Sequence, residues 1–251
     1  MKKHGCISYD ERGAGAPLVL VHGAFSDHWT NWEFVLPDWE KEFRVISVAR
    51  RGRGESARSL DHSLLDEARD VVGLLETMDR PVTLLGHSYG AHVALAAARM
   101  VPERVAKLVV YEPPRRSLFA SEAVQKLRTL VGDWDRFSAV FFGEVLLVPV
   151  EELLQLRASE LWPPIVADAP ASWQDIQAVS RYEFAAEDFA SLRMPVLLQT
   201  GTESPGHLYA TDALAAVLPQ AEIMRLEGQA HEGMTTAPEM YAKRVAEWIR
   251  S

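Results

Sequence analysis

The chain has 251 residues, 48% of them hydrophobic, and a formal net charge of −9 at pH 7. Its length and apolar content predict one main domain with a large buried core. Because the chain is acidic and has no basic block interleaved with aromatic residues, nucleic acid and anionic membranes are excluded as expected partners.

The amino-terminal segment and the cysteine usage predict a cytoplasmic location. No apolar signal-peptide core follows the two lysines after Met1, and nowhere do 18 apolar residues run together. The single cysteine, Cys6, has no partner for an internal disulfide and belongs to no cluster of metal ligands. We therefore expect no membrane span and a reducing compartment.

Short runs rich in Val, Ile and Leu alternate with longer segments of helical period, which is typical of a parallel sheet covered by helices. Strands are expected, in chain order, at Ile7–Tyr9, Leu18–Val21, Val45–Val48, Val82–Leu85, Leu108–Tyr111, Val196–Gln199 and Ile223–Leu226. Helices are expected at Leu64–Met78, Ala91–Met100, Thr211–Leu218 and Ala237–Ile249.

One long segment, residues 113–191, interrupts this alternation. It contains prolines and aromatic residues but no clear strand, which indicates a helical cap inserted between two strands of the sheet. We therefore predict an α/β core at 1–112 and 192–251 and a cap at 113–191. Aromatic side chains of the cap either line a cavity or pack the cap onto the core: Trp134, Phe137, Phe141, Phe142, Trp162 and Trp173.

A Gly-x-Ser-x-Gly pentapeptide, Gly86 to Gly90, lies where an expected strand gives way to an expected helix. In that context the serine occupies a strained strand-to-helix turn, and the glycines are needed because side chains would clash. The helix N-terminus nearby favours a developing negative charge. Ser88 is therefore the predicted nucleophile.

A serine hydroxyl needs a neighbouring base, and His231 follows the last expected strand in a loop that leads to the sheet's carboxyl edge. A tetrahedral intermediate also needs two N–H donors for its oxyanion. Tyr89, the residue after the nucleophile, supplies one. The loop His22–Phe25 supplies the other, and we assign it to Ala24, with Phe25 as the alternative.

Four motifs in this order resemble those of the α/β-hydrolase superfamily: HGAF at 22–25, RRGRGES at 50–56, GHSYG at 86–90 and GQAH at 228–231. The resemblance implies an eight-stranded, mostly parallel sheet, a cap after strand six, and a Ser-acid-His triad at the carboxyl ends of the strands. Many relatives have Asp where this chain has Ala49, at a position that is usually structural.

The resemblance leaves two positions for the triad acid. Many members place it after strand seven in a G-x-x-D pattern, where this chain has Gly201 to Ser204 and its carboxylate, Glu203, comes one residue early. Some haloalkane dehalogenases and lactone hydrolases carry the acid after strand six, where LVVYEPP places Glu112. We favour Glu112, because two prolines stiffen the chain after it; Asp212 is a third candidate.

The predicted function is hydrolysis of a carboxylic ester or lactone of a mostly apolar small molecule, through an acyl-enzyme on Ser88. The chemistry requires no metal or organic cofactor, and neither a dinucleotide nor a phosphate-loop motif occurs. Arg115 and Arg116 are either substrate-carboxylate ligands or solvated side chains. The alternatives are a carbon–carbon bond hydrolase, an acyltransferase or a perhydrolase on the same scaffold, or a non-catalytic small-molecule receptor.

Overall fold

A computed structural model describes residues 1–58, 61–119 and 122–251. Within these residues eight strands form one sheet in the order β1-β2-β4-β3-β5-β6-β7-β8. The pairs β1/β2 and β2/β4 are antiparallel, and the other neighbouring strands are parallel. The strands are β1 Lys2–His4, β2 Ile7–Arg12, β3 Ala16–Val21, β4 Phe43–Ala49, β5 Val82–His87, β6 Val105–Tyr111, β7 Val196–Gly201 and β8 Ala221–Leu226. The predicted mostly parallel, eight-stranded sheet is confirmed.

Strand β1 was not predicted, because its residues give no apolar signal. Lys2 and Lys3 are exposed, and the strand is held by its backbone at the edge of the sheet. Strand β2 also runs beyond the predicted Tyr9, since pairing with β4 continues as far as Arg12 opposite Val45. Edge strands of this kind are specified by pairing partners rather than by their own apolar pattern.

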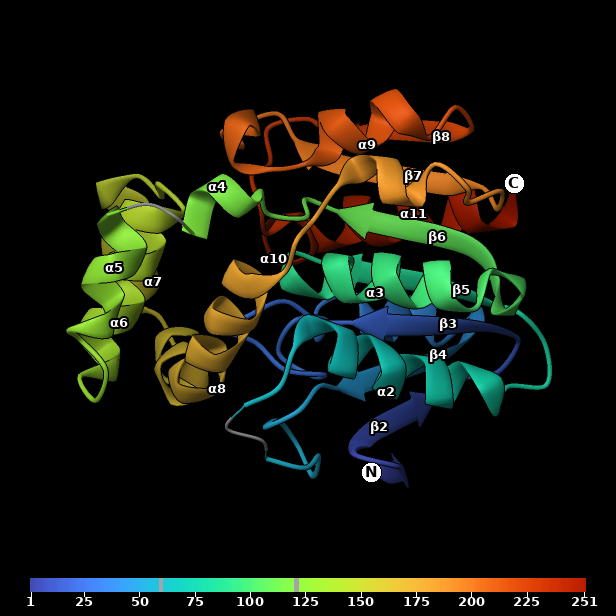
Figure 1. The fold of residues 1–251 in the computed structure, drawn as a ribbon, viewed down its shortest axis with the longest axis horizontal. Coiled ribbons are helices and arrows are strands. Elements are labelled where there is room, and N and C mark those ends of the chain that lie inside the picture. Colours follow the sequence, from blue (N-terminus) through green and yellow to red (C-terminus); the bar gives the residue numbers. More distant parts are fainter. Residues whose placement is uncertain (59–60, 120–121) are drawn as a thin grey trace.

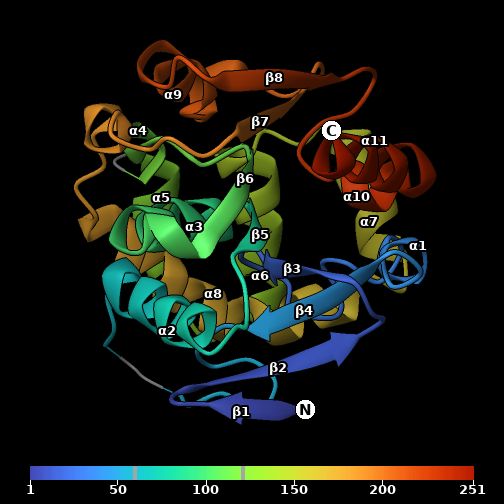
Figure 2. The same ribbon diagram turned by 90° about the vertical axis from the view of Figure 1, so that its right-hand side faces the viewer.

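Helices cover both faces of the sheet, and successive residues of β3 show how. Val19 and Val21 face the core under α2 (Leu64–Glu76), α3 (Tyr89–Met100) and α9 (Thr211–Val217). Leu18 and Leu20 belong to the core on the other face. That second face is covered by three helices (Figure 2), namely α1 Leu36–Trp39, α10 Gly233–Thr236 and α11 Pro238–Arg250.

The predicted helical insertion after β6 is confirmed. Figure 1 shows its helices gathered at the end of the sheet toward which β3 and β6 point. The insertion contains α4 Arg116–Phe119, α5 Glu122–Arg128, α6 Trp134–Val140, a π-helical turn η2 at Phe141–Val145, α7 Val150–Ala158 and α8 Trp162–Arg181. Residues 120 and 121 of the predicted cap lie outside the described residues, and the division of the chain at residues 112 and 192 stays a prediction.

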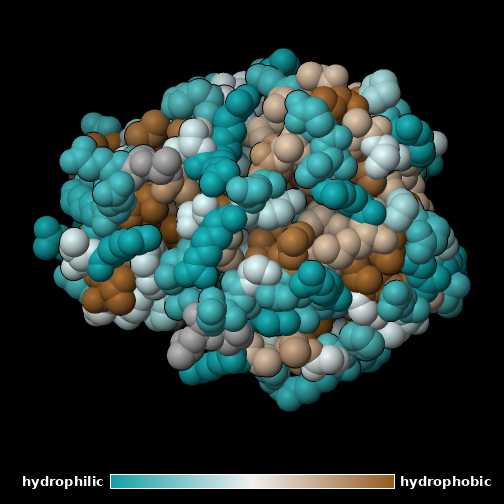
Figure 3. Space-filling view, in the orientation of Figure 1, coloured by the Kyte–Doolittle hydropathy of each residue, from teal (hydrophilic) through white to brown (hydrophobic). Residues whose placement is uncertain are grey.

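Single 3₁₀ turns complete the secondary structure at Pro102–Arg104 (η1), Ala186–Phe189 (η3) and Gly206–Leu208 (η4). None of the helices in the described ranges is long and apolar enough to cross a membrane. Polar side chains cover much of the face seen in Figure 3, with apolar patches between them. The carboxyl ends of the parallel strands and the cap together enclose the region that the sequence motifs single out.

Candidate active site

The turn between β5 and α3 has the strained geometry that the pentapeptide predicts. Ser88 has φ 54° and ψ −120°, outside the regions that side-chain-bearing residues favour. A Cβ atom on Gly86 would collide with the Gly90 carbonyl oxygen, and one on Gly90 would collide with the Val21 and His22 carbonyl oxygens. The two glycines are therefore required for the turn to pack against the sheet.

Helix α3 begins at Tyr89, two residues before the predicted start at Ala91. The predicted start was wrong because helical backbone angles resume directly after Ser88, and the Ala91 N–H already donates to the Ser88 carbonyl oxygen (3.0 Å). The Tyr89 N–H thus belongs to the first helical turn, whose N–H groups have no partner inside the helix. This donor lies next to the serine.

His231 lies in the loop after β8, on the same side of the molecule as Ser88. Its ring stacks on Tyr209, with centroids 4.9 Å apart and planes at 16°. Tyr209 lines the same small cavity as Ser88. The His231 carbonyl oxygen accepts a hydrogen bond from His87 Nε2 (3.0 Å), which ties the loop to the residue before the serine.

Glu112 is fully buried at the end of β6, and both of its carboxylate oxygens have partners. Oε2 lies 2.6 Å from His231 Nδ1, while Oε1 accepts from the Gly201 N–H (2.8 Å) and from Thr200 Oγ1 (3.1 Å). The residue has φ 45°, an uncommon backbone angle for glutamate. The end of β7 therefore clamps the carboxylate that faces the histidine.

The other two carboxylates proposed for this role lie elsewhere. Glu203 is exposed, and its N–H donates to the Gln229 carbonyl oxygen (3.0 Å). Asp212 is exposed in the first turn of α9. Sequence reasoning did not single out Thr200 or Tyr209, because a polar or aromatic residue near a strand end gives no signal of its partner across the sheet.

The Glu112 carboxylate changes the acid–base behaviour of His231. Burial by itself disfavours the charged ring, but the hydrogen bond from Nδ1 to Glu112 and the negative charge behind it outweigh burial and raise the pKa of His231 above its ordinary value. Since Nδ1 donates to the carboxylate, Nε2 of the neutral ring is left as the acceptor. The pair is therefore arranged to take up a proton at Nε2.

The loop His22–Phe25 packs directly against the serine. A Cβ atom on Gly23 would lie 3.2 Å from Ser88 Cβ. The N–H of Phe25, the alternative oxyanion donor, already donates to Ser172 Oγ of the cap (2.6 Å). The Ala24 N–H donates to no other described residue, and Ala24 lines the cavity at Ser88 together with Tyr89.

Two cavities meet at Ala24. The one at Ser88 has a volume of about 20 Å³, room for about one water molecule. The other cavity that Ala24 lines is a cleft of about 580 Å³. Apolar side chains of the loop after β3 and of the cap line much of the cleft: Phe25, Trp29, Phe34, Phe142, Leu156, Leu161, Pro164 and Ile165.

Some of the aromatic residues predicted in the cap line a cavity, and others pack the cap. Phe141 lines the cavity at Ser88, and Phe142 lines the cleft. Phe137 and Trp162 are buried in the apolar cluster of the cap. Trp134 and Trp173 pack against that cluster and line a separate hollow.

Neither arginine of the pair after Glu112 lines the cavity at Ser88. Arg115 donates from Nε to the Tyr209 carbonyl oxygen (2.5 Å), and Arg116 is exposed. Arg115 thus holds the backbone of the residue that stacks on His231.

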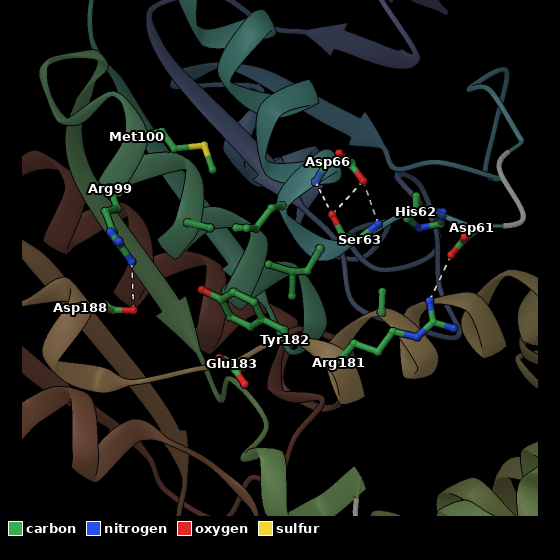
Figure 4. A pocket seen from close by; sticks show the side chains of 14 residues that line it. Asp61, His62, Ser63, Asp66, Arg99, Met100, Arg181, Tyr182, Glu183 and Asp188 are labelled. Atoms are coloured by element: carbon green, nitrogen blue, oxygen red, sulfur yellow. Dashed lines mark hydrogen bonds and ion pairs between the residues drawn. The ribbon is translucent and has the colours of Figure 1, made fainter.

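A groove of about 780 Å³ lies away from this centre, between α2, α3 and the end of α8. Its arginines already have partners: Arg99 pairs with Asp188 and Arg181 with Asp61, each at 3.1 Å (Figure 4). None of its described lining residues belongs to the group around Ser88.

Among the residues that the structure describes, two clusters have ligand atoms close enough together for a metal ion, His87-His231-Glu232 and His62-Glu67-Asp175. In the second cluster Arg50 bonds to both carboxylates at 2.7–3.0 Å, and Arg53 bonds to Asp175 at 2.7 and 3.1 Å, so two guanidinium groups already balance the two carboxylates. The first cluster contains the histidine that faces Glu112.

The chain is similar to several curated hydrolases. Over 108 residues the chain is 38% identical to a 2-hydroxymuconate semialdehyde hydrolase from a Pseudomonas species, covering 40% of this chain and 37% of that protein. It is 26% identical to an (E)-2-((N-methylformamido)methylene)succinate hydrolase from Acinetobacter baylyi, over 97% of this chain and 94% of that protein. Several curated relatives are matched over only 26% to 37% of their own length.

Among solved structures, an alpha/beta hydrolase from Sphaerobacter thermophilus superposes with a TM-score of 0.80. It is 26% identical and covers 97% of this chain and 96% of that chain. Residues 18–247 match the alpha/beta hydrolase family. The match spans the sheet from β3 to β8, the insertion after β6 and the loops that carry the serine, the glutamate and the histidine, and the chain therefore belongs to the alpha/beta hydrolase family.

Proposed function

We propose that this protein is a serine hydrolase that cleaves carboxylic esters or lactones through an acyl-enzyme on Ser88. The observation that carries the proposal is the buried Glu112–His231 pair, 2.6 Å between Oε2 and Nδ1, with His231 in a loop that bonds to His87, the residue before the serine of the strained turn. A carboxylate that orients a histidine next to such a serine is the arrangement that nucleophilic acyl transfer needs.

In the proposed first half-reaction, His231 Nε2 takes the proton of Ser88 Oγ as the oxygen attacks the substrate carbonyl carbon. The N–H groups of Ala24 and Tyr89 stabilise the resulting oxyanion. The carbon–oxygen bond to the alcohol breaks, and the leaving oxygen receives the proton from His231.

In the second half-reaction a water molecule gives its proton to His231 and attacks the acyl group. Collapse of the tetrahedral intermediate breaks the bond to Ser88 Oγ, which recovers the proton from His231. The carboxylic acid leaves, and Glu112 remains ionised throughout while it stabilises the imidazolium.

The two cavities suggest where each part of such a substrate binds. The small cavity at Ser88 favours a short acyl group, and the larger cleft suits a mostly apolar alcohol portion. Neither lysine nor arginine occurs among the described residues that line them, whereas Glu33, Glu160 and Glu232 line the second. These carboxylates favour an uncharged substrate over an anionic one.

Hydrolysis of an amide bond by the same residues, Ser88, His231 and Glu112, is the second candidate function. It is favoured by a relative that matches nearly the whole chain, whose name describes a substituted succinate with an amide. A succinate carries two carboxylates, and the absence of cationic side chains among the described lining residues argues for a different substrate in this protein.

The test is turnover of short-chain nitrophenyl esters and lactones, with labelling by a fluorophosphonate. Wild-type protein should hydrolyse acetate esters and be labelled at Ser88. Ser88→Ala should lose labelling and at least about 10³-fold in kcat. Labelling at another residue, or turnover that survives in Ser88→Ala, would contradict the proposal.

A further inference from the structure

We propose that Arg50 is a positioning residue for the oxyanion hole: its buried guanidinium holds the Gly23 carbonyl and thereby orients and polarises the Ala24 N–H. The inference rests on the proposed function, since it concerns the donor assigned to the oxyanion. It gives a role to a buried cation that the hydrolytic steps above do not use.

Arg50 directly follows β4 and is 1% exposed. Its Nη2 donates to the Gly23 carbonyl oxygen (2.8 Å), and its Nε donates to the His22 carbonyl oxygen (2.9 Å). Two successive carbonyls of the loop after β3 are therefore bound by one rigid, planar group. Guanidinium is suited to this because its N–H donors have fixed relative directions.

His22 adds a second donor to the same carbonyl. Its Nε2 accepts from the backbone N–H of Arg50 (3.2 Å), and its Nδ1 lies 2.7 Å from the Gly23 carbonyl oxygen. Burial lowers the pKa of His22 well below its usual range, and the charges of Arg50 and Arg53 add to the effect. The ring is thus neutral, and because Nε2 accepts, its one proton is on Nδ1 and is donated to Gly23.

The Gly23 carbonyl and the Ala24 N–H belong to one peptide unit. Described peptide bonds are trans, so the two groups point in opposite directions from a nearly planar unit. Fixing the carbonyl toward Arg50 therefore fixes the N–H on the opposite side. A charge-assisted hydrogen bond at the oxygen also draws electron density from the amide, which makes its N–H a stronger donor.

Three further contacts hold the guanidinium in place. Asp175 on the cap helix α8 binds Nη1 and Nη2 at 3.0 and 2.7 Å, and Glu67 on α2 binds Nη1 at 2.8 Å. The guanidinium carbon also lies 4.4 Å from the ring centroid of Tyr89, the residue that carries the other proposed oxyanion donor. Arg50 therefore contacts both parts of the oxyanion hole.

Arg50→Lys is the variant that tests the inference. An ammonium keeps the charge but cannot bind the His22 and Gly23 carbonyls and both carboxylates in the same geometry. We expect kcat on a nitrophenyl acetate to fall about 10- to 100-fold, less than the roughly 10²–10³-fold loss when an oxyanion donor is removed altogether. KM should change by less than about threefold, because the ground-state carbonyl uses these donors less.

The second measurement is affinity for a trifluoromethyl ketone, which forms a tetrahedral adduct with an oxyanion. Its Ki should rise by about the same factor as kcat/KM falls, an effect that a loss of stability alone would not produce. Arg51→Lys is the matched control: Arg51 pairs with Asp70 through Nε at 2.6 Å and does not contact the loop. It should leave kcat and Ki within about twofold of wild type.

Thermal unfolding is followed for every variant. If Arg50→Lys does not fold, Glu67→Gln carries the same test, because Glu67 binds Arg50 Nη1 at 2.8 Å, lines neither cavity and is replaced by a side chain of the same size; kcat should then fall and Ki rise together. The inference is overturned if the folded variant matches Arg51→Lys, or if kcat falls while Ki is unchanged. If wild-type protein neither hydrolyses esters nor is labelled at Ser88, the proposed function fails instead.

Discussion

Glu112 sets how the proposed base responds to pH. It is fully buried, and its carboxylate raises the pKa of His231 above the ordinary value near 6.5. A general base acts in its neutral form, so kcat/KM should rise with pH through this pKa. The rising limb of the profile in wild-type protein should therefore be centred above pH 6.5.

Replacing Glu112 by glutamine removes the negative charge and keeps the shape of the side chain. Glu112→Gln removes the larger of the two negative charges that oppose burial, the smaller being that of Glu232, so the pKa of His231 falls and the rising limb should move to lower pH. The plateau of kcat should drop by about 10²–10⁴-fold, because an amide favours the wrong histidine tautomer and does not stabilise the imidazolium.

Glu203→Gln is the control for that change. Glu203 is exposed and loses only a solvated charge, so both the plateau and the midpoint of its pH profile should match wild type. If Glu203→Gln lost as much activity as Glu112→Gln, the assignment of the acid role to Glu112 would be wrong.

The turn between β5 and α3 tolerates no side chain at its second glycine. In Gly90→Ala the new Cβ would meet the carbonyl oxygens of Val21 and His22, which are backbone atoms at the end of the central strand β3 and directly after it and cannot move freely. We expect a loss of about 2–4 kcal/mol in the free energy of unfolding, measured with denaturant. Gly206→Ala, which would have nothing within 4 Å, should lose less than about 1 kcal/mol.

The segment between α6 and α7 of the cap is expected to limit the acyl chain. Leu146 lines the cavity at Ser88 and is only partly buried, whereas its neighbour Leu147 is 46% exposed and does not line it. Leu146→Ala should raise kcat/KM for a butyryl ester relative to the acetyl ester by about tenfold, the scale of a methylene or two in a pocket. Leu147→Ala should keep the wild-type ratio, and an unchanged ratio in Leu146→Ala would show that another wall sets the limit.

At the scale of the whole molecule, the charge of −9 and the carboxylates of the cleft act in the same direction. The acetate ester of 4-hydroxybenzoate should therefore have a kcat/KM about tenfold below that of the neutral 4-hydroxybenzamide ester at low salt. Added salt should narrow the gap, because it screens exposed charges beyond about 10 Å. Equal values at low salt would mean that the cleft does not receive the alcohol portion.

Much of the fold is predictable because its signals are local. The apolar runs of β3, β5 and β6 are buried on both faces of the sheet and stand out in the sequence. By contrast, β1 depends on pairing with β2. The early start of α3 depends on the backbone angles at Ser88.

The sequence by itself determines the alternation of strands and helices, the insertion after the sixth strand and the glycines of the serine turn, since each depends on neighbours within a few residues. Tertiary structure alone decides which carboxylate faces His231 and which cation lies behind the Gly23 carbonyl. Glu112 and His231 are 119 positions apart, and Arg50 and Asp175 are 125 apart. Such pairs form only when strands adjacent in the sheet, and the cap above them, bring distant segments together, and no local pattern records that proximity.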